Sequence, residues 1–140
     1  MKLKQVPLEL INGMNKNTMM EALGIQCVEI GDDYVVSTMP VDHRTHQPMG
    51  LLHGGASAAL IESMGSMGSV LLIDPEKYAP VGLEVNANHV GSVRSGSVRA
   101  KATVVHAGKR THVWQVDIRD EATEKLVCTG RLTVMIVERK

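Results

Sequence analysis

The sequence is poor in aromatic residues. Among its 140 residues there is no Phe, one Trp and two Tyr. Nine Met and many Val, Leu and Ile must therefore fill the core. Methionine is flexible and polarisable, and a methionine-lined interior adapts to varied apolar shapes. This composition favours a tolerant apolar pocket.

Neither positive nor negative charge is in excess. The 15 Lys and Arg balance the 15 Asp and Glu, and the formal net charge is zero. The two signs are interspersed without runs, so the overall field attracts neither nucleic acid nor an anionic membrane. We therefore expect no nucleic-acid partner and no membrane partner.

Cysteine is scarce and a secretory signal is missing. Cys27 and Cys128 each lie in an apolar, strand-like segment, which favours two free thiols in a reducing compartment. The first 15 residues have neither a long apolar core nor a small-residue cleavage site. The span from Ala56 to Ile73 carries Glu62, four serines and two glycines, which favours a buried helix over a membrane span. We expect one soluble, cytoplasmic domain over residues 1–140.

The order of predicted elements indicates the fold class. Thr18 and Gly24 mark the ends of a short helix over Met19 to Leu23. A long, enclosed helix is predicted from Gly54 to about Ile73, after a polar loop over 41–52. Period-two patterns predict strands over 25–30, 34–39, 80–90, 97–106, 111–119 and 125–137. We therefore predict an α+β fold, in which an antiparallel sheet of about six strands wraps around one central helix. The exposed sheet edges favour a dimer.

A carboxylate within the long helix needs an explanation. Burial of an unpaired ionised Glu is costly, so Glu62 must be paired, protonated or open to a cavity. At about 100° per residue, Gly55, Glu62, Ser66 and Ser69 are predicted to share one face of the helix. That face is either a solvated edge or the wall of a site.

Two glycines precede this carboxylate at the start of the helix. The free N–H groups near Gly54 and Gly55 can approach a ligand closely, and the helix dipole favours developing negative charge there. Such a position suits the oxyanion of an acyl transfer reaction, although a glycine pair also serves a tight turn. Gly54 and Glu62 lie eight residues, or roughly 12 Å, apart along the helix. One carbonyl cannot easily contact both in one chain, so we predict two sites shared across a two-fold axis.

Other chemistries have weaker support. No G-x-S-x-G motif is present, so Ser57, Ser63 and Ser66 are not predicted to be nucleophiles. Asp42, His43, His46 and His53 do not form a closed ligand set, so we predict no metal.

Several polar residues near the helix have two interpretations each. His53 either orients the loop or polarises a substrate. Gln47 either donates its amide to a carbonyl or is an ordinary surface residue. The turn over 108–111, with His89 and Arg94, either binds phosphate at the rim of a site or is an ordinary basic turn.

Three segments resemble the hotdog-fold acyl-CoA thioesterases, in the PaaI-like branch that carries Glu on the central helix. They are TMPVDHRTHQPMGLLHGGASAALIESMGS, VGLEVNANHVGSVRSG and HAGKRTHVWQVDI. The resemblance implies that Glu62 is the nucleophile or general base, and that the Gly54 N–H and the Gln47 amide hold the carbonyl. It implies auxiliary roles for His53 and Ser66. It also implies CoA contacts by Gly82, His89, Val90, Gly91, Ser92, His106, Gly108, Lys109, Arg110 and Thr111.

The same resemblance implies hydrolysis of acyl-CoA thioesters, with aromatic acyl groups expected, and no cofactor beyond the CoA of the substrate. It implies dimers that commonly pair into tetramers, with sites between subunits. Relatives often carry a basic residue in place of Gly91, so one phosphate contact is in question. Two alternatives are a proofreading enzyme that removes misloaded aryl groups from an acyl carrier protein, and a non-catalytic acyl-CoA-binding protein.

Overall fold

The structure is a computed structural model that describes residues 1–140. It contains three helices and six strands. The helices are α1 (Leu8–Gly13), α2 (Met19–Leu23) and α3 (Gly54–Val70), and the strands are β1 (Gln26–Ile30), β2 (Tyr34–Pro40), β3 (Tyr78–His89), β4 (Ser97–Ala107), β5 (Thr111–Asp120) and β6 (Leu126–Glu138).

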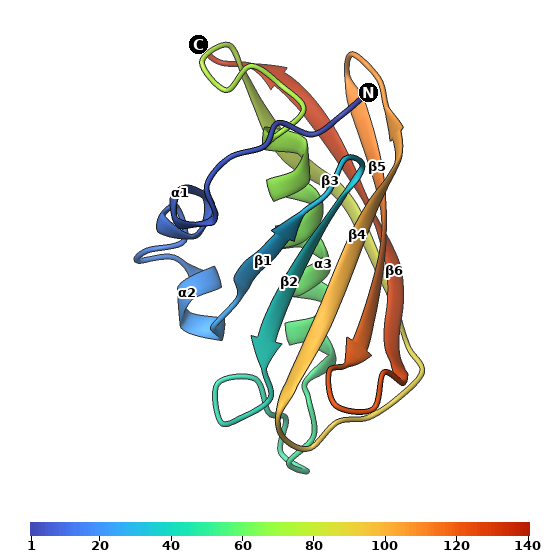
Figure 1. Ribbon diagram of the computed structural model, residues 1–140. Helices are drawn as coiled ribbons and strands as arrows, with labels where there is room; N and C mark the ends of the chain where they lie inside the picture. The colour runs from blue at the N-terminus through green and yellow to red at the C-terminus, as the bar shows by residue number, and fades with distance from the viewer.

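The six strands form one antiparallel sheet in the order β1-β2-β4-β5-β6-β3. The sheet curls around α3, which runs along its concave side (Figure 1). This arrangement confirms the predicted α+β hotdog fold.

The core lies between α3 and the concave face of the sheet. Leu60, Ile61 and Met64 of α3 are fully buried, as are Trp114 and Leu132 of the sheet. The helix lies close to the strands because glycine occupies two of its sheet-facing positions. A Cβ at Gly65 would overlap the Leu132 side chain, and one at Gly68 would overlap the Trp114 ring. Ser69 continues this face: its hydroxyl accepts a 2.9 Å hydrogen bond from Trp114 Nε1.

Three expectations about the helices need correction. Ser69 lies seven residues after Glu62 on the same side of α3, but it borders neither solvent nor the wall of a site, because it is fully buried against the sheet. The long helix ends at Val70, three residues early, before a turn in which the Asp74 carbonyl accepts from Tyr78 N. Helix α1, which begins after Pro7, has no counterpart among the predicted elements. Its six residues are too short for an amphipathic period to stand out.

The short helix α2 has the predicted bounds. The Thr18 hydroxyl caps it by accepting from Met20 N, and Gly24 ends it in the left-handed conformation with φ 75°. Glu21, three residues after the cap, accepts from the backbone N–H of Asn17, one residue before the cap.

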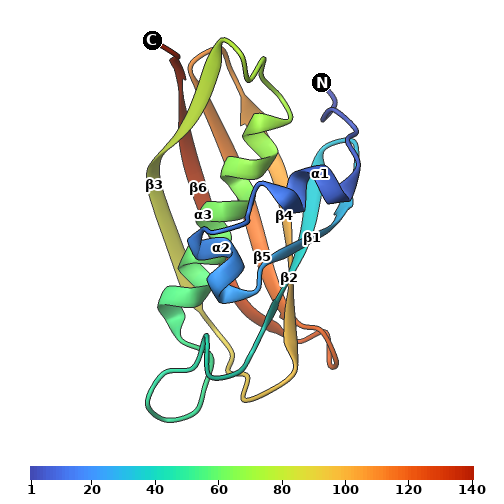
Figure 2. The ribbon, with the colours of Figure 1, turned by 90° about the vertical axis from the view of Figure 1, so that its left-hand side faces the viewer.

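The two N-terminal helices lie across the side of α3 that the sheet leaves open (Figure 2). Asn12 at the end of α1 attaches them to β1. Its side chain donates to the Cys27 carbonyl at 2.9 Å and accepts from Cys27 N at 2.8 Å. The Asn12 amide thus binds the backbone N–H and carbonyl of Cys27, as a neighbouring strand would, and holds α1 at a fixed place beside the sheet.

Strand β3 forms an unpaired edge of the sheet, next to β6. Val81, Leu83 and Val85 alternate along it and are 48%, 56% and 40% exposed. An apolar edge of this length is a template for pairing with another strand.

None of the helices is long and apolar enough to cross a membrane.

Candidate active site

Glu62 lies in the middle of α3 and is half-buried. Its carboxylate forms no ion pair with any basic side chain and accepts no hydrogen bond within the chain. It lines a cavity of about 340 Å³. Of the options for a carboxylate at this position, the structure shows no pairing within the chain and an opening to a cavity.

The cavity is mostly apolar and is bounded by three parts of the chain: the N-terminal helical region, α3 and β3. The lining residues from α3 recur every three or four positions and so lie on one side of the helix, and Glu62, Ser63 and Ser66 are the polar ones. The other lining residues are Ile11, Met14, Asn15, Met20, Met67, Val70 and Pro80. Ser66 thus lies beside Glu62 as predicted. A volume of this size is at the low end of small-molecule pockets, which span about 300–1,000 Å³.

Gly82 of β3 lies against the Glu62 carboxylate. A Cβ at position 82 would overlap Glu62 Oε1. The register of β3 against β6 shifts between Gly82 and Glu84, so the strand is also irregular here. Gly82 thus makes room for Glu62, and its contact with CoA stays a prediction.

The start of α3 offers one free backbone donor. Gly55 N–H donates to His53 Nδ1 at 2.7 Å, and Ala56 N–H donates to the His53 carbonyl at 3.0 Å. Gly54 N–H has no partner within the chain. It therefore combines an unused donor with the positive end of the helix dipole.

His53 is the N-cap of α3. Because Nδ1 accepts the hydrogen bond from Gly55, the neutral ring carries its proton on Nε2, which points away from the cap. The side chain is exposed. His53 can thus fix the helix start and still offer a second N–H donor beside Gly54.

Gln47 lies in the loop before α3, and the loop orients its amide. The side-chain Oε1 accepts from Met49 N at 2.5 Å and from Leu51 N at 3.3 Å. Within a side-chain amide only the oxygen can accept a hydrogen bond from a backbone N–H, so these contacts fix which end of the amide is which. The Nε2 group forms no hydrogen bond within the chain and remains available as a donor.

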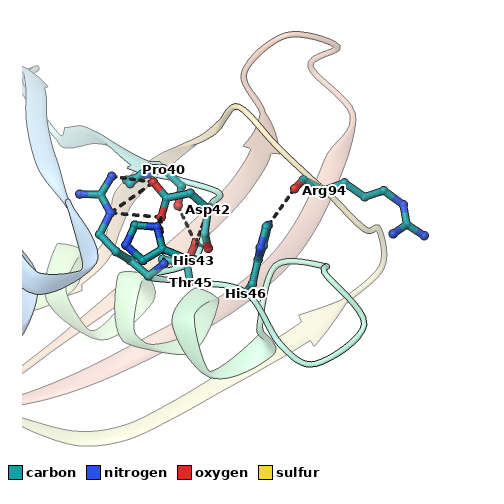
Figure 3. Close-up of polar contacts among 7 residues, drawn as sticks. Pro40, Asp42, His43, Thr45, His46 and Arg94 are labelled. Atoms are coloured by element: carbon teal, nitrogen blue, oxygen red, sulfur yellow. Dashed lines mark hydrogen bonds and ion pairs between the residues drawn. The ribbon is translucent and has the colours of Figure 1, made fainter.

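Further hydrogen bonds hold this loop in place, as Figure 3 shows. Arg44 binds the Asp42 carboxylate through Nη2 at 2.7 Å, and this contact holds the pKa of Asp42 well below its usual range. Thr45 Oγ1 donates to the Pro40 carbonyl, and His46 Nε2 lies 2.8 Å from the Arg94 carbonyl. No group of three or more His, Cys, Asp or Glu has the arrangement of a metal site.

His89, at the end of β3, lies next to the helix start. A Cβ at Gly54 would come within 2.9 Å of His89 Nε2. The residues after His89 are exposed as far as Ser92, and Val90 N and Gly91 N both donate to the Val127 carbonyl. At Gly91 a Cβ would lie 2.6 Å from the Leu126 carbonyl oxygen, so a side chain there requires the backbone to move.

The basic turn between β4 and β5 lies at the other end of α3. Gly108 and Lys109 line a second cavity together with Leu72, Ile73 and Asp74, which follow the helix. Within the turn, Gly108 N donates to the Thr111 carbonyl and the His106 ring lies beside Gly108. Within one chain this turn and His89 lie at opposite ends of α3, so one chain alone does not form the predicted basic rim.

The predicted site residues therefore form three groups along α3. Gln47, His53, Gly54 and His89 lie at its start, Glu62, Ser66 and Gly82 at its middle, and His106 to Thr111 beyond its end. The cavity residues of α1 and α2 were missed by sequence reasoning. Only tertiary packing places them opposite Glu62, and no local pattern signals it.

Comparison with known proteins identifies the family of the chain. The sequence model described as "Thioesterase superfamily" matches residues 49–127. The chain is 48% identical to 1,4-dihydroxy-2-naphthoyl-CoA hydrolase of Escherichia coli, over 96% of this chain and 97% of that protein. It is 43% identical to the proofreading thioesterase EntH of Cronobacter sakazakii, over 96% of each chain.

A solved structure is equally similar. The crystal structure of a mutant thioesterase from Pseudomonas aeruginosa superposes with a TM-score of 0.95 at 46% identity, and the match covers 99% of this chain and 100% of that one. The matches extend over nearly the whole of this chain and of these proteins. The chain belongs to the thioesterase superfamily and is a thioester hydrolase.

Proposed function

We propose that the protein hydrolyses acyl-CoA thioesters with small aromatic acyl groups, and that Glu62 is its nucleophile or general base. One observation carries the proposal: Glu62 is an unpaired carboxylate that opens into an apolar cavity of about 340 Å³. The E. coli relative is named for an aromatic acyl-CoA substrate, which supports this substrate class.

In the first step the thioester oxygen is held at the start of α3. The Gly54 N–H and the Gln47 Nε2 are both free to donate to it. Donors that are already oriented stabilise the negative charge that develops on this oxygen during attack. His53 Nε2 is a further donor at the same end of the helix.

In the second step a carboxylate supplies the attack. Glu62 either adds to the carbonyl carbon, forming an anhydride that water then hydrolyses, or takes a proton from the attacking water. In both routes the C–S bond breaks, CoA leaves as the thiolate, and water supplies the oxygen of the free acid. The acyl group occupies the cavity that Glu62 lines.

The attacking Glu62 belongs to the partner subunit of a homodimer. Gly54 and Glu62 of one chain are roughly 12 Å apart along α3, too far to serve one carbonyl. Antiparallel pairing of two such helices brings the start of one near the Glu62 of the other. The unpaired apolar edge of β3 supports this dimer. The same two-fold axis brings the basic turn of one chain toward the helix start of its partner, where it contacts the CoA phosphates.

The first experiment compares thiol release from a panel of aryl and aliphatic CoA thioesters by the native protein and Glu62→Gln. We expect the variant to be at least ~10³-fold slower, since it loses its base or nucleophile. Glu121→Gln, an exposed carboxylate in the β5–β6 turn, is the matched control and keeps native rates. Equal rates for the native protein and Glu62→Gln would refute the role of Glu62.

A second experiment tests whether the site is shared between subunits. Glu62→Gln and Gln47→Ala chains are folded together in equal amounts. Half of the dimers then contain both chains, and each of these has one intact site if residues 47 and 62 come from different subunits. Activity should rise to about a quarter of the native value. No gain over the separate variants would place both residues in one chain.

A carrier-protein substrate is the alternative, because one relative is a proofreading thioesterase. The same aryl group is offered on CoA and on a carrier's phosphopantetheine. Faster release from the carrier would assign the enzyme to proofreading.

A further inference from the structure

The cavity beside Glu62 contains a polar side chain that hydrolysis itself does not need. Asn15 lies between α1 and α2 and is only 7% exposed, yet it lines this cavity. A buried amide normally has partners for its polar atoms.

The hydrogen bonds of Asn15 leave one atom without a partner. Its Nδ2 donates to the Ile25 carbonyl at 3.4 Å, and its backbone carbonyl accepts from the backbone and the hydroxyl of Thr18. Its backbone N–H donates to Asn12. Oδ1 receives no donor. Among fully enclosed side-chain atoms only Ser37 Oγ is unpaired, so Oδ1 of Asn15 must reach open space, which here is the cavity.

The position of this acceptor is fixed by its neighbours. Asn12 binds both backbone groups of Cys27, which holds α1 against β1. Thr18 ties the backbone of Asn15 to the start of α2. The amide therefore presents Oδ1 in one orientation, without an ordering cost when a ligand enters.

The surroundings of Oδ1 are apolar. Ile11, Met14 and Met20 flank Asn15 on the N-terminal side of the cavity, and Met67 and Val70 lie on the α3 side. An acyl group that fills this space displaces water from Oδ1. An unhydroxylated group leaves the acceptor unpaired, whereas a group with a suitably placed O–H restores the hydrogen bond.

We propose that Asn15 is a specificity-determining residue, whose Oδ1 accepts a hydrogen bond from a hydroxyl on the acyl group and so selects hydroxylated aromatic acyl groups. This inference rests on the proposed function, because it takes the cavity beside Glu62 as the acyl site.

The test compares benzoyl-CoA with the three monohydroxybenzoyl-CoA isomers. We expect the native kcat/KM to favour at least one isomer over benzoyl-CoA by about tenfold, the size of one net hydrogen bond. In Asn15→Leu, which has a similar volume and no acceptor, this ratio should fall to about one. Met20→Leu changes the same cavity without removing a polar group and should keep the native ratio.

The ratio separates specificity from structural damage, because damage lowers both rates together. If Asn15→Leu does not fold, Asn15→Ala, which also has no side-chain acceptor, replaces it and the same loss of preference is expected. A native enzyme with no preference for any isomer, or an unchanged preference in the variant, would overturn the inference while thioester hydrolysis stands.

Calorimetric binding of benzoate and the hydroxybenzoates gives a readout without turnover. If no thioester is hydrolysed but the native protein prefers a hydroxybenzoate and Asn15→Leu does not, the enzymatic function fails and the recognition role of Asn15 stands. If neither preference exists, the inference fails as well.

Discussion

Glu62 and Gly82 are in direct contact across the gap between α3 and β3: the carboxylate occupies the space that a side chain at position 82 would need. The strand register shifts at the same place. The edge strand therefore contributes to where the carboxylate lies, although it carries no acidic group at that point.

Gly82→Ala should displace the Glu62 carboxylate. A shift of about 1 Å at a reacting group can cost on the order of 100-fold in rate, so we expect a loss of kcat of that order. Gly82 is exposed, so the unfolding free energy should change by no more than about 1 kcal/mol. Steady-state kinetics and urea unfolding measure the two effects. Gly13→Ala, which has no atom within 4 Å of its new Cβ, is the control and should be neutral in both. A fully active Gly82→Ala would show that the contact does not position Glu62.

His53→Ala should destabilise the start of α3. The variant removes the acceptor for Gly55 N–H, and loss of an N-cap costs typically about 1 kcal/mol. Asn is a good N-cap residue, so His53→Asn should recover most of this stability in urea unfolding. If the Ala and Asn variants unfold at the same urea concentration, the ring does not act as a cap.

Ser69→Ala should be among the more damaging small substitutions in the core. Trp114 Nε1 and His112 Nδ1 both lie 2.9 Å from the Ser69 hydroxyl, and both would be left buried without it. Each unsatisfied group costs about 1–3 kcal/mol, which thermal and urea unfolding will detect. Ser63→Ala, on the cavity side of the same helix, forms no such contacts and should stay within about 0.5 kcal/mol of the native protein.

His112 should make the fold less stable at acidic pH. Its side chain is buried, and burial, with a smaller effect of the nearby His106, lowers the pKa of His112 below the usual value of about 6.5. Between the folded pKa and about 6.5 the unfolded chain binds more protons than the folded one, so the unfolding free energy falls as the pH falls through this window. One such group contributes at most about 1.4 kcal/mol per pH unit.

Urea unfolding from about pH 7.5 to 5 tests this dependence. His112→Gln cannot be protonated, so its stability should fall less steeply over the same range, even if it starts lower. An identical slope in the native protein and the variant would mean that His112 does not cause the loss.

Much of the fold could be predicted because its signals are local. The start of α3 at Gly54, the left-handed Gly24 and the long strands follow from turn residues and from the spacing of apolar side chains. The short α1 carries too few residues for such a period. The helical projection correctly puts Ser69 on the same side of α3 as Glu62, but it could not show that Trp114, 45 residues later, binds the Ser69 hydroxyl in the core.

The candidate site was predictable only in part. The type and spacing of residues in LLHGGASAALIES indicate an acyl-transfer site at Gly54 and Glu62, and both lie where a cavity and a free N–H are found. The contacts of Gly82 with Glu62 and of Asn15 with the cavity depend on how distant segments pack. No property of those two residues in the sequence distinguishes them from a strand glycine and a turn asparagine.

The two glycines that bring α3 close to the sheet divide the helix into two faces, which differ in how far their residues can change without loss of folding. Positions 65 and 68 cannot gain a methyl group without moving Leu132 or Trp114, so almost any change there affects folding. Positions 63 and 66, which flank the proposed catalytic residue Glu62, border open space and can change with little effect on folding. Laboratory evolution of new substrates should therefore accumulate changes along the second face while the first stays constant, and a library that randomises only the cavity face should retain a high fraction of folded members.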